Sequence, residues 1–294
     1  MPHSHIASVI RQIDSFPPLP ATAIRVLKIT GNPESSAHEL MQAILPDQSM
    51  CVAILKIVNS AFFGSPRQIS SIEEAVIVLG FLEIRNIVLT QAVFSSFQKF
   101  RHISKPRIDT LWQHSLTCGL AAKMIADRTA GYSPSHLFIA GLIHDIGKLT
   151  LLMAYPNYSP ASEVSGHLAL TSTAEEKAQF GISHDQVGMR LLNRWLFPEQ
   201  LCAATGSHHH PASAPDNAAF PLLIQMADIL SHAIHSEEMI KGRDILDLID
   251  NLTPDSTPLW SRYNLDWQEE DIEKWLTDLR EALQDGTLLE MFNA

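Results

Sequence analysis

Two adjacent residues, His144 and Asp145, lie inside the otherwise apolar residues 135–152, which read SHLFIAGLIHDIGKLTLL. On a helix, Lys148 lies over the same turn, because it follows the histidine by four residues and the aspartate by three. An ionised carboxylate among leucine and isoleucine side chains costs several kcal/mol unless a cation or strong donors meet it. A bound metal ion would do so, and metal binding is the first chemistry that this stretch suggests.

Other polar residues extend this possibility. His114, His184 and Asp228 fall on apolar faces of expected helices, and the run 208–210, which includes His208 and His209, ends another helix. Each histidine, taken alone, could also be a hydrogen-bonded residue of the core. The run 208–210 could equally be a solvated helix end. Buried aspartates are harder to explain without a partner, and a site of five imidazoles and two carboxylates would explain both. Such donors suit Fe, Mn, Zn or Ni and do not suit calcium.

Helical periodicity runs through the chain, and no segment favours a strand. We therefore expect an all-α fold in two packed helical parts. The boundary falls between Gln98 and Pro106, where the chain turns polar and basic. This division gives residues 1–104, residues 105–236 and an extension, 237–294. Within the first part, a capping box of Ser70 with Glu73, or of Ser71 with Glu74, predicts a helix start. A turn is expected at residues 62–64 and a loop at 156–173.

Charge and cysteine content limit the classes of function. The formal net charge is −11, and residues 237–294 hold 15 of the 32 Asp and Glu residues but 5 of the 21 Lys and Arg residues. The remainder is near neutral and has no basic stripe, which argues against direct nucleic-acid binding. Three widely separated cysteines predict a reducing compartment. No apolar run reaches the roughly 18 to 20 residues of a membrane span, so we expect a cytoplasmic protein.

The pattern of His114, the doublet His144-Asp145 and Asp228 resembles the H…HD…D pattern of the HD superfamily of metal-dependent phosphohydrolases. Three upstream segments sharpen the likeness. They read FPPLPATAIRVLKIT, AILPDQSMCVAILKIVNSAFFG and ISSIEEAVIVLGFLEIRNIVLTQAVF. These segments are similar to the HDOD domain, a bacterial signalling relative of the HD domains. The resemblance covers roughly residues 8 to 236 and implies that the second helical part is an HD-like bundle.

The resemblance also implies a ligand set. HDOD domains are generally regarded as regulatory modules without catalysis, and many lack the metal ligands, but this chain keeps them, together with Lys148 of an HDxxK pattern. His184, His208 and His209 look like the additional ligands of HD-GYP cyclic-di-GMP phosphodiesterases. By this resemblance, seven residues would hold up to two divalent ions, with Asp145 bridging them. They are His114, His144, Asp145, His184, His208, His209 and Asp228.

In a catalytic site of this kind the metals activate water for attack on phosphorus, while Lys148 adds positive charge. Asp145 and Lys148 are therefore the candidate catalytic residues. The Gly-Tyr-Pro loop expected after the histidine doublet is replaced by residues 210–215, HPASAP. We thus expect a signal-transduction module that binds metal and contacts an unidentified signalling protein, with little or no hydrolysis. The alternative is an active phosphohydrolase or phosphodiesterase with a nucleotide or phosphodiester ligand. A third interpretation is a structural helical protein whose histidines are core residues.

Overall fold

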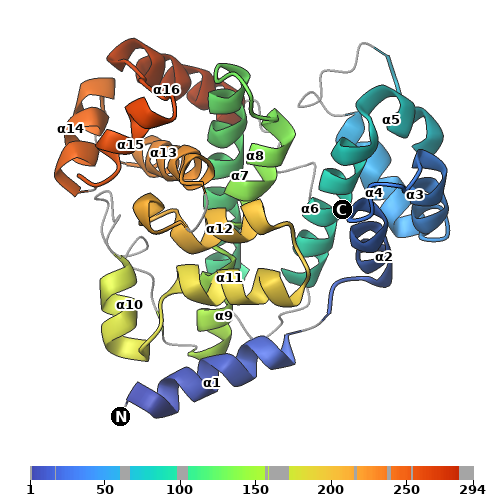
Figure 1. Cartoon of the computed structure of the whole chain (residues 1–294), viewed down its shortest axis with the longest axis horizontal. Coiled ribbons are helices and arrows are strands. Elements are labelled where there is room, and N and C mark those ends of the chain that lie inside the picture. The colour runs from blue at the N-terminus through green and yellow to red at the C-terminus, as the bar shows by residue number, and fades with distance from the viewer. Residues whose placement is uncertain are drawn as a thin grey trace. The chain divides into compact units, whose positions relative to one another are not determined.

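The computed structural model describes residues 2–16, 18–59, 67–97, 105–155, 158, 172–214, 217–236, 240–252 and 254–284. Helices joined by turns make up these ranges, and no strand occurs within them (Figure 1). The predicted all-α class is therefore confirmed. The turn expected at residues 62–64 lies outside the described residues, as do most of the loop expected at 156–173 and most of the predicted boundary at 98–106.

The helices fall into two compact units. The smaller unit, within Pro17–Arg101, contains α2 (Ala21–Thr30), α3 (Ala37–Ile44), α4 (Gln48–Val58), α5 (Ile72–Leu79) and α6 (Phe81–Phe97). The larger unit consists of Met1–Phe16 and His102–Ala282. Its helices are α1 (Pro2–Ser15), α7 (Lys105–Asp127), α8 (Pro134–Ile143), α9 (Ile146–Ala154), α10 (Ser172–Phe180), α11 (His184–Arg194), α12 (Glu199–Ser207), the 3-10 turn η2 (Pro211–Ser213), α13 (Ala219–Ile234), α14 (Gly242–Leu252), α15 (Thr257–Arg262) and α16 (Glu269–Gln284).

This division differs from the sequence-based one at both ends of the chain. The sequence grouped residues 1–104 and set 237–294 apart, whereas the structure places α1 and the C-terminal helices in the larger unit. The reason is long-range packing: α1 lies against α9, α10 and α11, and α15 lies against α13. The buried face of α16, which carries Trp275 and Leu279, gives the acidic segment its own share of the core.

Local signals in the smaller unit act as the sequence predicts. Of the two proposed capping boxes, the pair Ser71 and Glu74 is the one at the start of α5: the Ser71 hydroxyl accepts from Glu74 N at 3.0 Å. The Glu74 carboxylate in turn accepts from the backbone N–H of Ser70 at 2.9 Å. Gly80 ends α5 with a φ of 89°, a conformation that costs glycine little because it has no Cβ. The chain then turns by 120° into α6.

Two close helix crossings organise the larger unit. At the first, a Cβ placed on Gly141 of α8 would lie 2.8 Å from Gly119 Cα of α7. At the second, a Cβ on Gly147 of α9 would lie only 1.8 Å from the carbonyl oxygen of His184 and 2.7 Å from Gly188 N, both on α11. The absence of side chains thus lets α7 and α11 approach the α8–α9 segment on both sides of residues 144 and 145.

Helix α1 is held to the larger unit by Arg194, near the end of α11. Its guanidinium donates to the carbonyl oxygens of Ile13, of Phe16 at 3.0 Å and of Asp14 at 2.8 Å. These carbonyls lie in the last turn of α1 and just beyond it, where backbone acceptors take partners from outside the helix. The ring of Phe16 also packs edge-on against Trp195, with 5.4 Å between centroids.

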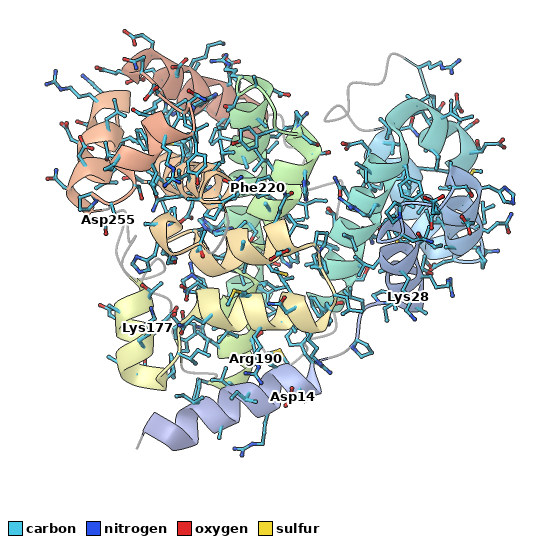
Figure 2. All side chains as sticks on the ribbon, viewed as in Figure 1. Asp14, Lys28, Lys177, Arg190, Phe220 and Asp255 are labelled. Carbon is cyan, nitrogen blue, oxygen red and sulfur yellow. The ribbon has the colours of Figure 1, made fainter. Side chains whose placement is uncertain are left out.

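Replacing Arg194 by glutamine is expected to release the end of α1, because three carbonyl contacts to a charged donor are lost. We expect a loss of about 1 to 3 kcal/mol in unfolding free energy, together with faster protease cleavage near residue 16. The matched control is Arg190→Gln, an exposed arginine one turn earlier on α11 (Figure 2). Equal protease sensitivity of the two variants would contradict the role given to Arg194.

One stretch of the larger unit has the composition of a membrane span. Pro134–Ala154 comprises 21 residues and contains an 18-residue window with a mean hydropathy of 1.6. The pairs α3 with α4 and α5 with α6 also pass by length and composition, but only if each bent pair counts as one span. The expectation that no apolar run is long enough is therefore wrong for residues 134–154. Of that window, 89% is buried inside the protein, and packing within the larger unit accounts for its apolar character.

Candidate metal centre

The doublet His144-Asp145 occupies a break between two helices. The sequence predicted one continuous helix here, but α8 ends at Ile143 and α9 begins at Ile146. Asp145 takes φ −98° and ψ 13°, outside the helical values, and precedes the first turn of α9. The break lets the two carboxylate oxygens of Asp145 face different groups of histidines. Lys148 remains within reach, with its Nζ 2.5 Å from Asp145 Oδ2.

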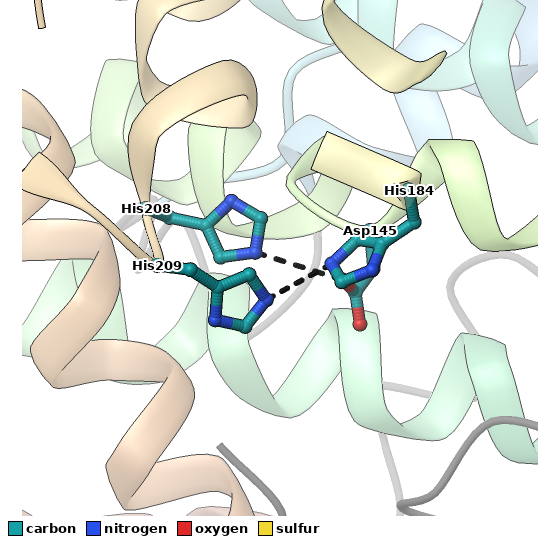
Figure 3. Close-up of side chains that lie close together, drawn as sticks. All are labelled: Asp145, His184, His208 and His209. Carbon is teal, nitrogen blue, oxygen red and sulfur yellow. Dashed lines mark hydrogen bonds and ion pairs between the residues drawn. The ribbon is translucent and has the colours of Figure 1, made fainter. Parts of the chain in front are cut away.

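Asp145 Oδ1 faces three histidines from α11 and the end of α12 (Figure 3). His184 Nε2 lies 3.1 Å from this oxygen and His208 Nε2 lies 3.8 Å from it. His209 Nε2 lies 2.9 Å from His184 Nε2. One ligand atom from each of the four residues falls within 4.8 Å of every other, so they could share one ion.

The second oxygen, Asp145 Oδ2, faces a group formed by α7, α8 and α13. His114 Nε2 and His144 Nε2 each lie 3.3 Å from it. The same two nitrogens lie 3.0 and 3.4 Å from Asp228 Oδ1. All seven residues of the predicted ligand set are therefore brought together, in two groups that meet at the Asp145 carboxylate.

The ring orientations of four histidines are set by hydrogen bonds at Nδ1. The partners are Gly141 O for His144 at 2.7 Å, Thr205 O for His208 at 2.8 Å, Glu176 Oε2 for His184 at 2.7 Å and Ser231 Oγ for His114 at 3.1 Å. The carbonyl and carboxylate partners can only accept, so they favour the proton on Nδ1 and leave the Nε2 lone pair facing inward. Metal-ligating histidines are commonly held in this way.

The donor set fits a metal ion on two further grounds. Three buried atoms, Asp145 Oδ1, His208 Nε2 and Asp228 Oδ1, make no hydrogen bond with any described residue and have only ion-pair contacts, so a metal ion would satisfy them. The nitrogen-to-oxygen distances around the two carboxylates are mostly 3.0 to 3.4 Å. Donor atoms that each lie about 2.1 Å from one ion have about this spacing.

Without metal, the cluster balances its own charge. Burial raises the pKa of Asp145, but the nearby His144 and Lys148 hold that pKa well below its usual range. Burial likewise opposes a charged His184, yet its contacts with Glu176 and Asp145 raise the pKa of His184 to about 9. Burial, together with the charges of His144 and His184, lowers the pKa of His208 to about 4. The Asp145 carboxylate likewise raises the pKa of His144 and of Lys148 against the effect of burial, so the positive charge that these groups favour is the charge that a metal ion would otherwise supply.

A comparison with known families decides the relationship of the chain. The HDOD domain family matches residues 16–211, which is two thirds of the sequence. The chain belongs to the HDOD family. The resemblance that the sequence carries is therefore confirmed, and the matched region contains six of the seven predicted ligands, with Asp228 beyond its end.

Solved structures share the fold of this HDOD protein. An HDOD domain protein of unknown function from Geobacter sulfurreducens is 25% identical, with a TM-score of 0.66 and coverage of 99% of this chain and 97% of that one. A protein from Shewanella amazonensis SB2B, provisionally named a phosphohydrolase, is 20% identical, with a TM-score of 0.71 and coverage of 98% and 97%.

An uncharacterised protein of Treponema pallidum (strain Nichols) is similar in sequence and is 25% identical over 212 residues. That match spans 71% of the HDOD protein but only 40% of the Treponema protein.

Two polar residues beside the candidate metal centre were not predicted from the sequence. His232 stands four residues after Asp228 on α13, with its Nε2 3.4 Å from Asp228 Oδ1 and its ring 4.5 Å from that of His114. The i+4 spacing could have revealed it. Glu176 of α10 is buried and accepts from the backbone N–H of His184 at 2.7 Å, from its imidazole, and from the Tyr158 hydroxyl. No sequence spacing connects Glu176 with the doublet.

Glu176 should tune the metal affinity of the HDOD protein by holding His184. Because Glu176→Gln removes the carboxylate that accepts from Nδ1, we expect a 10- to 100-fold weaker metal affinity, measured by titration with a competing chelator. Glu175→Gln changes the exposed neighbouring carboxylate on the same helix and serves as the control. If both variants bind metal like the wild type, Glu176 has only a structural role.

The site is closed on most sides. His144, His184 and His208 are 0% exposed and Asp145 is 1% exposed. His209 is 9% exposed, and the side chain of His114 is 13% exposed. In the run 208–210, the first two histidines point inward and His210 is exposed, followed by the short turn η2 in place of a Gly-Tyr-Pro loop. Among the seven predicted ligands, His114 and His209 are the most exposed.

Proposed function

We propose that this HDOD protein is a signalling module that holds up to two divalent metal ions and acts through contacts with a protein partner, with little or no hydrolysis. The seven residues of the candidate metal centre would be the ligands, and Asp145 would bridge the ions through its two oxygens. Bound metal would supply positive charge to the core of the larger unit. Fe, Mn, Zn and Ni all suit a site of imidazoles with carboxylates.

Burial is the observation that carries the proposal. Hydrolysis of a phosphodiester needs an open coordination position and groups that orient the substrate. The three histidines around Asp145 Oδ1 are almost wholly buried: His184 and His208 are 0% exposed and His209 is 9% exposed. Lys148, the candidate for contact with a phosphoryl oxygen, is 4% exposed and is directed at Asp145 Oδ2. The site is therefore better suited to binding metal than to positioning a substrate.

Exposed apolar side chains in the smaller unit support the proposed contact with a protein partner. Among described residues, seven large hydrophobic side chains are exposed, and five of them lie in this unit. They are Leu45, Val52, Ile77, Val78 and Leu82. Ile77 is 76% exposed and Val52 is 66% exposed, although aliphatic side chains of this size are usually buried. These exposed apolar side chains are the candidates for a surface that binds a protein partner.

A hydrolysis screen on protein of known metal content tests the proposal. With Mn or Fe bound, we expect slow or no turnover of cyclic-di-GMP, because the orienting loop is a short turn. Weak activity on a small activated phosphodiester, such as bis(p-nitrophenyl) phosphate, should disappear in both Asp145→Ala and Lys148→Ala. Efficient cyclic-di-GMP hydrolysis that vanishes on replacement of His208 or His209 would contradict the module and favour an enzyme.

The second candidate function is that of a metal-dependent phosphohydrolase or phosphodiesterase. The specific observation in its favour is the complete donor set, with two groups of ligands meeting at one carboxylate. Metal ions held by these residues would supply the positive charge that polarises a phosphoryl group and activates water. Under this function, Asp145 would position both ions and Lys148 would neutralise charge on the substrate.

A further inference from the structure

A cavity separate from the metal centre lies between the HDOD core and the C-terminal helices. It has a volume of about 1060 Å³ and lies wholly within the larger unit. Its walls come from the loop after α7, from the start of α8, from the first turns of α12 and α13, from the segment between α15 and α16, and from the first turns of α16. Cavities that bind small molecules are typically of roughly 300 to 1,000 Å³. None of the seven predicted metal ligands lines it.

Five Phe, Tyr or Trp residues line the cavity. Tyr132 follows α7 and Phe220 lies in the first turn of α13, and their ring centroids are 6.4 Å apart (Figure 2 labels Phe220). Tyr263, Trp267 and Trp275 come from the C-terminal segment, and the last two rings lie 5.6 Å apart. Tyr263 also joins the two sides, because its hydroxyl accepts from the backbone N–H of Ala218 at 3.2 Å. Aromatic faces attract cations through the ring quadrupole.

The charged groups in the wall favour the same kind of ligand. Three carboxylates, Glu199, Asp266 and Asp271, line the cavity, against one guanidinium, Arg128, which lies 3.4 Å from the carboxylate of Asp278. Asp266 accepts from the Ser261 hydroxyl at 2.6 Å, and Asp271 accepts from a backbone N–H at 3.0 Å. These donors are neutral, so they orient the carboxylates without cancelling their charge. The wall is therefore net negative.

We propose that this cavity binds a small organic cation, of the alkylammonium or quaternary ammonium class. An anion would be repelled by the three carboxylates, and a neutral ligand would cover them without supplying a counter-charge, which costs free energy. A cation would contact the aromatic faces and offset the carboxylates together. This ligand site is independent of the metal centre and of the proposed module function. Most of its rings lie beyond residue 211, where the family match ends.

The test uses choline and the larger benzyltrimethylammonium as probes, with 3,3-dimethylbutan-1-ol as the neutral counterpart of choline. Calorimetric titration of the full chain should detect at least one cation, which should bind about tenfold more tightly than the neutral alcohol. Its binding should weaken as salt is added. If neither cation binds, or if choline and the neutral alcohol bind equally, the proposal is overturned.

Two variants locate the binding. Glu199→Gln removes an exposed carboxylate of the wall, and Trp267→Leu removes a half-buried ring. Each should weaken cation binding severalfold while leaving the metal content unchanged. Glu270→Gln, an exposed carboxylate on α16 that does not line the cavity, is the matched control. If Glu270→Gln weakens binding as much as Glu199→Gln does, the cation is attracted by the general acidity of the segment, and the proposed site is wrong.

Discussion

Chelation of the bound metal is expected to lower the melting temperature of the protein by about ten degrees. A ligand present at 1,000 times its dissociation constant stabilises the folded state by about 4 kcal/mol. For a domain of this size, each kcal/mol shifts the melting temperature by about 2 to 4 °C. The effect should be large because three buried polar atoms of the cluster have no hydrogen-bond partner among the described residues.

Two variants separate metal binding from folding. The double variant Asp145→Asn/Lys148→Met removes both members of the buried pair, so it should fold, lose metal and melt near the temperature of the chelated wild type. The single variant Asp145→Asn leaves Lys148 buried beside a neutral group in place of its partner at 2.5 Å, and should melt lower still. A wild-type melt that is indifferent to chelator would mean that the histidines are ordinary core residues.

Gly147→Ala is expected to be the most damaging single-methyl change in the larger unit. The added Cβ would lie 1.8 Å from the carbonyl oxygen of His184, and backbone cannot rotate away as a side chain can. Helices α9 and α11 must therefore separate, which costs well over the roughly 1 to 3 kcal/mol of ordinary overpacking. The same movement draws His184 away from Asp145, so metal binding should fail even where the protein still folds.

The contrast with Gly206 makes this prediction specific. A Cβ on Gly206 of α12 would first meet Met189 Sδ at 2.5 Å, which is part of a flexible side chain that is 37% exposed. Gly206→Ala should therefore be tolerated, since alanine is also the better helix former by about 1 kcal/mol. Thermal melts and metal titrations of both variants test whether Gly147→Ala loses more stability and more metal affinity than Gly206→Ala. Equal stability of the two would contradict the proposed helix crossing.

Much of the fold was predictable because local signals and packing agree. The all-α class that the helical periodicity predicted and the capping pair Ser71 and Glu74 both appear as expected. The resemblance also identified the polar residues that the fold brings together around Asp145. The break between α8 and α9 was missed, because an apolar run with helical spacing does not reveal where a helix is interrupted.

The features that could not be predicted depend on contacts between distant residues. Helix α1 belongs to the larger unit because Arg194 reaches carbonyls some 180 positions earlier in the chain. Glu176 supports His184 from a helix whose composition gives no sign of a site. The tight approach at Gly147 is equally invisible in the sequence, where a glycine in a helix usually reads as a weak point.

The metal content of the purified protein tests the central claim most directly. Elemental analysis of protein prepared without chelator should find close to two divalent ions per chain, and close to none in Asp145→Asn/Lys148→Met. Two ions are expected because each oxygen of Asp145 faces its own group of histidines. A wild-type protein that carries no metal, and takes up none when Mn, Fe, Zn or Ni is supplied, would contradict the account.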